Sequence, residues 1–343
     1  MTPPDKRRPT IIDVARSARV SVTTVSHALN RKGQVNEQTR RRVEEAARAL
    51  GYHPNPRAQR LRTGQGRTIA LMSSMPFGIS GGLARFGFMM EVAGVAAEEA
   101  FARGLALVLV PPLRNDALSQ RRIEIDGAIL LEPAADDATL AWLRQQNLPV
   151  VCIGRPLGVD DVPYVDVLTA LGTDMLLSHL WQQGARHIGL VIGSQVRNSY
   201  VECTESYRGF CAARGIAPMI ESVDEAAAEA GGHRACAALL RRHPELDALL
   251  VPVDAFAVGA LDALGEAGRN VPGDVRVATR YDGVRARTSR PPLTALDLHL
   301  EVMASQAVSL LFALIYGGED LGPRLAPPPP ALIVRDSSRT TGR

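Results

Sequence analysis

The sequence predicts an all-α head of helix-turn-helix type joined to an α/β body, and three observations lead to this fold class. Residues 10–30 place capping residues ahead of apolar residues at helical spacing. After residue 67, short apolar runs alternate with longer helical stretches, as in parallel sheets covered by helices. The 343 residues are 46% hydrophobic, which suffices for two or three domains with sizeable cores.

The first two predicted helices form a tight pair near the N-terminus. Thr10 can cap the first helix with Asp13 three residues on, and Ser21 can cap the second. Thr23 and His27 are four residues apart and point away from the first helix. The inward faces are apolar: Val14, Ala15 and Ala18 on the first helix, and Val25 and Leu29 on the second.

A third helix and a short fourth one follow. Asn36 can cap the third helix, and Gly51 marks its end. Asn55 and Pro56 then suit the cap and first position of a helix that runs to about Arg62 and is too short to be stable alone. We expect this segment to fold only when it docks. The predicted inward stripe of the third helix is Val43, Ala46, Ala47 and Leu50.

The charge of the head favours DNA over an ordinary helical hairpin as the reason for these helices. Residues 1–66 carry 14 Lys and Arg against 5 Asp and Glu, a net charge of +9. Residues 67–343 hold the remaining 25 and 31, a net charge of −6. A helical pair alone is compatible with either interpretation, but nine excess positive charges on 66 residues indicate phosphate binding.

The body is expected to contain buried parallel strands joined by helices. Helices are predicted near 91–103 and 172–183, between apolar runs. A run of four prolines, 327–330, predicts an extended connection before the last strand. The predicted strands are 68–73, 105–110, 127–131, 150–153, 187–192, 248–253 and 275–278.

The head carries a specific combination of motifs: Ile12-Asp13-Val14-Ala15, Val20-Ser21, Thr24-Val25-Ser26 through Leu29-Asn30, Thr39-Arg40 with Val43, Gly51-Tyr52, Pro54-Asn55 and Ala58 to Leu61. Looser similarity continues at Asp126-Gly127, Val150 to Pro156, His179-Leu180, Gly184 to Gly193, Tyr281-Asp282, Pro292 to Thr294 and Leu332 to Arg335. On these residues the chain resembles the LacI/GalR repressors over nearly its whole length.

The resemblance implies a domain organisation. Residues 1–54 would form the helix-turn-helix domain and residues 55–66 a hinge helix with its linker. Residues 67–343 would form an effector-binding and dimerisation domain of two Rossmann-like subdomains, similar to periplasmic binding proteins. The subdomains would span approximately 67–167 with 298–326, and 168–297 with 327–343, with a ligand in the cleft at the carboxyl ends of the strands.

The resemblance also implies which residues contact DNA. His27 stands where relatives commonly have Arg, so base preference would differ there, unless His27 is only a surface residue. Leu61 matches an apolar wedge for the minor groove, with hinge packing as the alternative. Bases would be read by Val22, Thr23 and His27, phosphates or caps would involve Thr10, Ser21, Thr24, Ser26 and Asn30, and the hinge would contribute Asn55, Ala58 and Leu61.

Arg19 departs from the family pattern, because relatives usually have Gly in this turn. A turn glycine often serves a left-handed conformation, which Arg enters at a cost of about 1–2 kcal/mol. We expect a strained turn whose cost a phosphate contact by Arg19 could offset.

The effector site follows the family less closely. Asp282 and Asp254 match acidic positions of the family, whereas Ser206, Val253 and Leu298 replace polar ones. A buried sugar hydroxyl without a partner costs about 1–3 kcal/mol, so a neutral sugar is disfavoured.

Two arginines and one aromatic residue remain as candidate ligand contacts. Arg208 or Arg280 could bind an anionic effector or could form ordinary salt bridges. Phe88 could stack on a ligand or could pack in the core. We therefore expect an effector that is anionic or less polar than a free sugar, or no effector.

Several protein classes are disfavoured by what the sequence lacks. It contains no phosphate-loop, nucleophile-elbow or zinc-protease motif, so we expect no enzyme, no cofactor and no metal. The N-terminal residues lack a signal peptide's apolar segment and no run reaches a membrane span's length, so we expect a cytoplasmic protein without a membrane partner. Four cysteines without paired spacing indicate reduced thiols.

These observations predict a sequence-specific transcriptional regulator that acts as a repressor. It would bind a palindromic operator as a homodimer and respond to a small molecule in the cleft. The alternative is an effector-independent or architectural DNA-binding protein with a degenerate cleft. No leucine heptad follows Arg335, so a tetramer is not expected.

Overall fold

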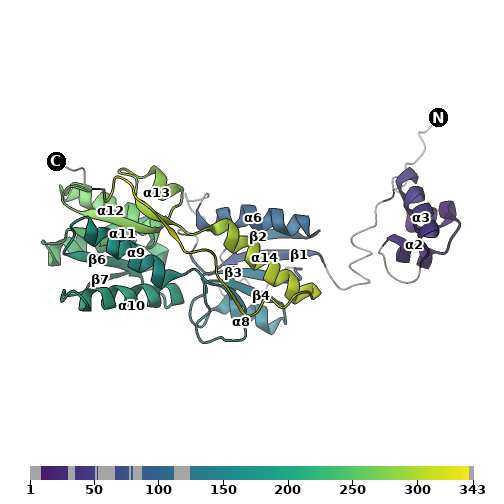
Figure 1. Cartoon of the computed structure of the whole chain (residues 1–343), viewed down its shortest axis with the longest axis horizontal. Coiled ribbons are helices and arrows are strands. Elements are labelled where there is room, and N and C mark those ends of the chain that lie inside the picture. Colours follow the sequence, from purple (N-terminus) through teal and green to yellow (C-terminus); the bar gives the residue numbers. More distant parts are fainter. Residues whose placement is uncertain are drawn as a thin grey trace. The chain divides into compact units, whose positions relative to one another are not determined.

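The computed structural model describes residues 9–29, 35–50, 52, 66–76, 79, 87–111 and 124–339. The chain divides into two units, residues 1–66 and residues 67–343. We call them the head and the body and describe each by itself (Figure 1). Four of the predicted DNA contacts lie outside the described residues: Asn30, Asn55, Ala58 and Leu61.

The head contains three helices whose predicted caps are confirmed. They are α1 (Ile11–Ala18), α2 (Val22–Leu29) and α3 (Glu37–Leu50). The backbone N–H and the hydroxyl of Thr10 both donate to the Asp13 carboxylate, at 2.8 and 2.7 Å. Ser21 Oγ accepts from the N–H of Thr24 at 3.0 Å, and Asn36 Oδ1 accepts from that of Thr39 at 2.8 Å. The three bonds donated by a backbone N–H each satisfy a donor that a helix start leaves without a partner.

The three helices enclose a small apolar core, and one predicted member is missing from it. Leu50, the last residue of α3, is 37% exposed, so the predicted stripe is wrong at that position. Tyr52 packs against the core instead, and its N–H donates to the carbonyl of Ala47 at 2.9 Å. The buried residues of the core are Val14, Ala15, Ala18, Val25, Ala28, Val43, Ala46 and Ala47.

The first subdomain of the body is built on a parallel sheet with the strand order β11-β5-β4-β3-β1-β2. Its strands are β1 (Thr68–Ser73), β2 (Ala106–Val110), β3 (Gly127–Leu131), β4 (Val150–Ile153), β5 (Tyr164–Val165) and β11 (Arg324–Leu325). Its helices are α6 (Phe88–Ala102), α8 (Ala138–Gln145) and α14 (Leu300–Tyr316).

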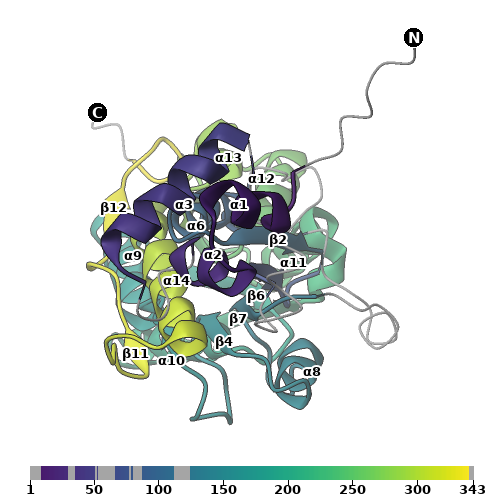
Figure 2. The same cartoon turned by 90° about the vertical axis from the view of Figure 1, so that its right-hand side faces the viewer.

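Strand alternation sends the side chains of β1 to two different layers. Ile69 and Leu71 join the core beneath α6 and α14, whereas Ala70 and Met72 join a separate core beneath α8. Figure 2 shows α8 on the side of the sheet away from α14. Both faces of the first sheet are therefore covered, which explains why its central strands read as continuous apolar runs.

The second subdomain is built on a sheet with the order β12-β10-β9-β8-β6-β7, in which only β12 is antiparallel to its neighbour. Its strands are β6 (Ile188–Gly193), β7 (Met219–Val223), β8 (Ala248–Leu250), β9 (Arg276–Tyr281), β10 (Thr294–Asp297) and β12 (Ala331–Ile333). Its helices are α9 (Thr169–Gln182), α10 (Asn198–Ala212), α11 (Ala228–Arg242), α12 (Asp254–Glu266) and α13 (Val284–Thr288), with a short 3-10 turn at Glu225–Ala227.

The chain passes between the two sheets three times. It leaves the first sheet after β5, returns after β10 to form α14 and β11, and leaves again to end in β12. The predicted fold class, a helical head joined to two Rossmann-like subdomains, is therefore confirmed. All seven predicted strands exist, although β8 ends at Leu250 and β9 extends to Tyr281.

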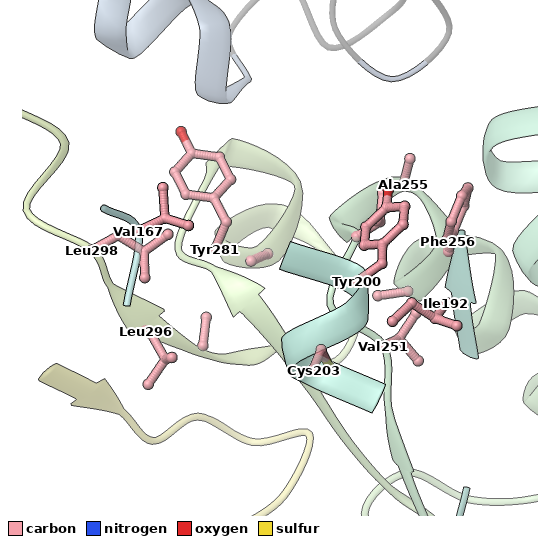
Figure 3. Close-up of a cluster of buried hydrophobic side chains, with 14 of the residues drawn as sticks. Val167, Ile192, Tyr200, Cys203, Val251, Ala255, Phe256, Tyr281, Leu296 and Leu298 are labelled. Carbon is pink, nitrogen blue, oxygen red and sulfur yellow. The ribbon is translucent and has the colours of Figure 1, made fainter. Parts of the chain in front are cut away.

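Figure 3 shows part of the core of the second subdomain. Tyr200 and Phe256 lie near Ile192 and Val251 at one end of this cluster, and Tyr281 lies near Leu298 and Val167 at the other. The four cysteines are buried and form no disulfide with one another, and burial raises the pKa of Cys203 to about 11. Among the described residues, no helix is both long and apolar enough to cross a membrane.

Candidate functional site

Helix α2 presents the predicted base-reading residues on its accessible face. Val22 is 42% exposed, Thr23 is exposed and His27 is half-buried. The opposite face is fixed by Val25 and Ala28, which are fully buried in the head core. Because these two anchors set the rotation of α2, the outward side chains are held ready to contact another surface.

The polar residues around the start of α2 are engaged in local hydrogen bonds. Ser21 caps the helix, and its hydroxyl lies 2.8 Å from that of Thr24. Thr10 is similarly occupied by Asp13, and Ser26 is half-buried. Thr10 and Ser21 therefore have capping roles, and a phosphate contact by either of them would come in addition.

Arg19 adopts the left-handed conformation that the turn between α1 and α2 requires, with φ 51° and ψ 47°. The turn is closed by the N–H of Val20, which donates to the carbonyl of Ala15 at 3.0 Å. The expectation of a strained turn is thus confirmed, at a cost of about 1–2 kcal/mol for a non-glycine residue. The Arg19 side chain is exposed.

A cavity lies between the two subdomains at the carboxyl ends of their strands. Its empty volume is about 580 Å³, counting the space that is open to solvent. Parallel sheets commonly bind ligands at this edge. The described residues that line it are Ser73, Met75, Ile79, Gly87, Phe88, Met89, Leu131, Glu132, Pro252, Val253, Asp254, Arg280 and Tyr281.

One side of this cavity is apolar and aromatic. Phe88, at the start of α6, meets Tyr281, at the end of β9, edge to face with ring centroids 5.5 Å apart. Met75, Met89 and Val253 extend the apolar surface. Phe88 thus both packs on the protein and lines the cavity, so its two predicted roles are compatible.

The lining of the cavity also contains a buried ion pair. Glu132 follows β3 in the first subdomain, and its Oε1 accepts from Arg280 Nη2, on β9 of the second, at 2.8 Å. Its Oε2 accepts from Ser199 Oγ at 2.6 Å. Arg280 also donates to Thr169 Oγ1 at 3.2 Å. Arg280 had two predicted roles, an anionic effector's partner or an ordinary salt bridge, and the structure shows the salt bridge, to a carboxylate of the chain itself.

A second buried ion pair lies next to the first. Arg197, which precedes α10, donates to Glu225 through Nε and Nη2 at 2.8 and 2.7 Å. Its remaining donors cross to the first subdomain, where they meet the carbonyl of Glu132 and, at 3.1 Å, that of Ser74. Arg197 and Glu225 are each 1% exposed. Their hydrogen bonds therefore satisfy buried polar groups in both subdomains.

Asp254 is the other carboxylate at the cavity. It occupies the first turn of α12, where its Oδ1 accepts from the N–H of Ala255 at 2.7 Å. Burial raises the pKa of this carboxyl, and Arg285, 3.6 Å away, opposes that rise. Asp254 could therefore accept a hydrogen bond from a ligand or, when protonated, donate one.

The structure separates the remaining predicted effector residues from this cavity. Asp282 faces a neighbouring cavity with Leu298, and its carboxylate pairs with Arg335 at 2.6 Å. Ser206 and Arg208 lie on α10, half-buried and exposed, and the described lining of the first cavity includes neither. Phe88, Asp254 and Arg280 are thus brought together, and Ser206, Arg208 and Asp282 are not.

Sequence reasoning missed Glu132, Ser199, Arg197 and Glu225. One signal was present for Glu132, which is a single charged residue directly after the apolar run 127–131. A charged residue in that place lies at the carboxyl end of a strand, where ligand sites form. The other three have no comparable signal, because their partners are distant in the sequence.

Comparisons with known proteins agree with this architecture. A family model described as bacterial regulatory proteins of the lacI family matches residues 10–55, and one described as a periplasmic binding protein-like domain matches residues 177–338. The HTH-type transcriptional regulator CelR of Thermobifida fusca is 32% identical over 335 residues, 91% of this chain and 93% of that protein. The HTH-type transcriptional regulator GalR of Escherichia coli is 30% identical over 315 residues, 89% of each.

Two solved structures are similar over nearly their whole length. A complex of the transcriptional regulator CelR with cellobiose has a TM-score of 0.72 and 30% identity, covering 96% of this chain and all of that one. The lac repressor dimer bound to operator and the anti-inducer ONPF has a TM-score of 0.74 and 24% identity, covering 97% and 100%.

The capped helix pair and the two-lobed body together define a DNA-binding protein with a periplasmic-binding-protein-like domain. The chain belongs to the LacI family of HTH-type transcriptional regulators. The expected resemblance is therefore confirmed, and the relatives named here are regulators of transcription rather than enzymes.

Proposed function

We propose that this regulator is a cytoplasmic, non-enzymatic repressor that binds a palindromic operator as a homodimer through the outward face of α2. The observation that carries the proposal is the accessible face of Val22, Thr23 and His27, held by the buried Val25 and Ala28, on a head of net charge +9. Two such heads related by twofold symmetry would read inverted half-sites.

The division of labour along the chain forms part of this proposal. Residues 1–54 would read DNA, residues 55–66 would connect the head to the body, and residues 67–343 would dimerise and bind the effector. The lac repressor, of similar fold, was solved as a dimer on its operator. Asn55, Ala58 and Leu61 would then lie at the central minor groove, where Leu61 would unstack a base step.

Selection of binding sites from a randomised duplex library tests this proposal with the full chain. We expect an inverted repeat, and we expect Thr23→Ala to relax the preference at one symmetric position. Glu45→Ala serves as the control, because Glu45 is exposed on α3 and carries a charge that DNA repels. Enrichment of no motif, or of one unchanged by Thr23→Ala, would contradict base reading by α2.

The effector would be a small molecule that is less polar than a free sugar. CelR was solved with cellobiose, but in this chain the cavity surface is largely apolar and its ion pair is already formed. A ligand with an apolar or aromatic part would pack on Phe88 and Tyr281, while Asp254 would bind one polar group. A thermal-shift screen of the full chain with neutral metabolites, with Asp254→Ala as a comparison, tests this assignment.

The alternative function is regulation without an effector. It is favoured by one observation, which is that the charged groups of the cleft are bonded to one another across the two subdomains. Such a body would be a rigid dimerisation module. Operator affinity that no metabolite in the screen changes would favour this alternative.

A further inference from the structure

The carboxylate of Glu132 occupies a site that has the composition of an anion-binding site. Each of its two oxygens has a separate partner in the second subdomain, Arg280 Nη2 at 2.8 Å and Ser199 Oγ at 2.6 Å. Arg280 is itself held by Thr169 at 3.2 Å. A guanidinium and a hydroxyl at these distances are the donors with which proteins bind a free carboxylate.

The site is buried and borders the cavity. Glu132 is 4% exposed, Ser199 2% and Arg280 8%, and both members of the ion pair line the cavity. Removing the Glu132 side chain would therefore enlarge the cavity beside the Arg280 guanidinium and leave that group without its carboxylate. The site would then be open to a small anion of the same shape.

The backbone of Glu132 is adapted to this position. Its φ is 48°, in the left-handed region that non-glycine residues rarely adopt. Its carbonyl accepts from Arg197, whose side chain also bonds the carbonyl of Ser74 at 3.1 Å. Both the side chain and the main chain of one residue thus join the first subdomain to the second.

We infer that Glu132 is an internal ligand: it fills an anion site formed by Arg280 and Ser199, bridges the cleft in place of an anionic effector, and excludes such effectors from the cavity. This inference rests on the proposed ligand cavity and narrows its ligand class to molecules without a carboxylate or phosphate. A tethered carboxylate competes at high effective concentration, and a second anion beside it would be repelled in this low-dielectric site.

The experiment measures thermal unfolding of the full chain in sodium acetate and in sodium chloride of equal ionic strength. Glu132→Ala should lower the melting temperature by roughly 5 °C or more, because it leaves the Arg280 charge buried without its partner. About 100 mM acetate should then raise the melting temperature of this variant by roughly 2–4 °C relative to chloride. Wild type should show no such difference, because its site is filled.

Three control variants separate site filling from general salt effects. Glu132→Gln keeps the site filled and should not respond to acetate. Glu132→Ala combined with Arg280→Met removes the cation and should also lose the response. Asp161→Ala opens an exposed ion pair with Arg144, 2.6 Å in wild type, and should respond no more than wild type. Equal acetate responses of Glu132→Ala and wild type, or none in either, would overturn the inference.

A second measurement uses folded wild-type protein and remains decisive if Glu132→Ala does not fold. Titration with sugar acids and sugar phosphates should show no binding tighter than about millimolar, where roughly 4 kcal/mol is available. Tighter binding that Arg280→Gln abolishes would overturn the inference. Operator selection and the neutral-ligand screen test the proposed function separately, so either idea can fail without the other.

Discussion

The outer face of α2 and the inner surface of the cavity are both candidate binding surfaces. The polar side chains of α2 face outward, whereas charged side chains of the cavity are bonded to each other. In the head, Thr23 and His27 project from a helix whose anchors, Val25 and Ala28, are buried. In the cavity, Glu132 and Arg280 are bonded to each other. The head is therefore arranged to contact a large charged partner, whereas the cavity has satisfied its own charges and offers a ligand mainly apolar surface.

The largest effect on stability should come from breaking the network of buried ion pairs and hydrogen bonds that joins the two subdomains at the cleft. Arg197→Ala should destabilise the full chain by about 3–5 kcal/mol, because it leaves Glu225 buried without a counter-charge. It also removes the donors to the carbonyls of Glu132 and Ser74. Urea denaturation followed by circular dichroism measures this loss.

The matched control for Arg197→Ala is Arg144→Ala. Arg144 pairs with Asp161 at 2.6 Å, but both side chains are exposed, so its loss should cost less than about 1 kcal/mol. Similar costs for the two variants would mean that burial of the Arg197 network contributes nothing, and the contrast between head and cleft would lose its energetic basis.

The second prediction concerns base reading by the exposed face of the head. His27→Arg should change the preferred base at one symmetric operator position by roughly 1–3 kcal/mol, because a guanidinium binds guanine through two hydrogen bonds. Stability should change little, since His27 is only half-buried. Binding-site selection with both proteins measures the change, and an identical motif for both would show that His27 reads no base.

Much of the head could be predicted from the sequence because its signals are local. The caps at Thr10, Ser21 and Asn36 each bond a residue three positions away, so their spacing is visible in the chain. The burial of Leu50 was predicted wrongly because the apolar spacing continues to the last residue of α3, whereas the apolar core of the head does not reach it. Seven strands of the body were equally visible as apolar runs, whereas β5 and β11 have only two residues each and β7 carries Glu221 and Ser222.

The cavity could be predicted only in part because its polar partners are distant in sequence. Glu132 and Arg280 are 148 positions apart, and no pattern in the sequence predicts that they pair. The family acid Asp282 was a reasonable candidate from its motif, but the structure pairs it with Arg335 beside a different cavity. Which charges neutralise each other depends on how the two sheets are placed, and spacing along one strand carries no such information.

A third, smaller effect concerns pH and the one cavity carboxylate whose pKa is raised. Because burial raises the pKa of Asp254 in the folded chain, the folded state favours the protonated acid, and ionisation costs stability as pH rises through the folded pKa. Asp254→Asn should therefore stabilise the chain at pH 7. The advantage should shrink as pH falls toward the pKa of an unfolded aspartate.

Thermal unfolding between about pH 4, near the pKa of an unfolded aspartate, and about pH 8 measures this dependence. Glu301→Gln is the control, since Glu301 is an exposed acid in the first turn of α14. An advantage of Asp254→Asn that grows as pH falls would mean that Arg285, not burial, dominates at this carboxyl.

The smallest effect tests whether the head, like the cleft, holds a strained residue for a purpose. Arg19→Gly removes the cost of a left-handed arginine but adds freedom to the unfolded chain, so the net gain in stability should be at most about 1 kcal/mol. If the exposed Arg19 side chain also contacts a phosphate, the same variant should bind operator more weakly and lower the salt dependence of binding by about one ion. Arg19→Asn separates the two effects, because asparagine tolerates the left-handed conformation and lacks the charge. Equal operator affinity and equal salt slope for all three proteins would leave the strain at Arg19 without a function in DNA binding.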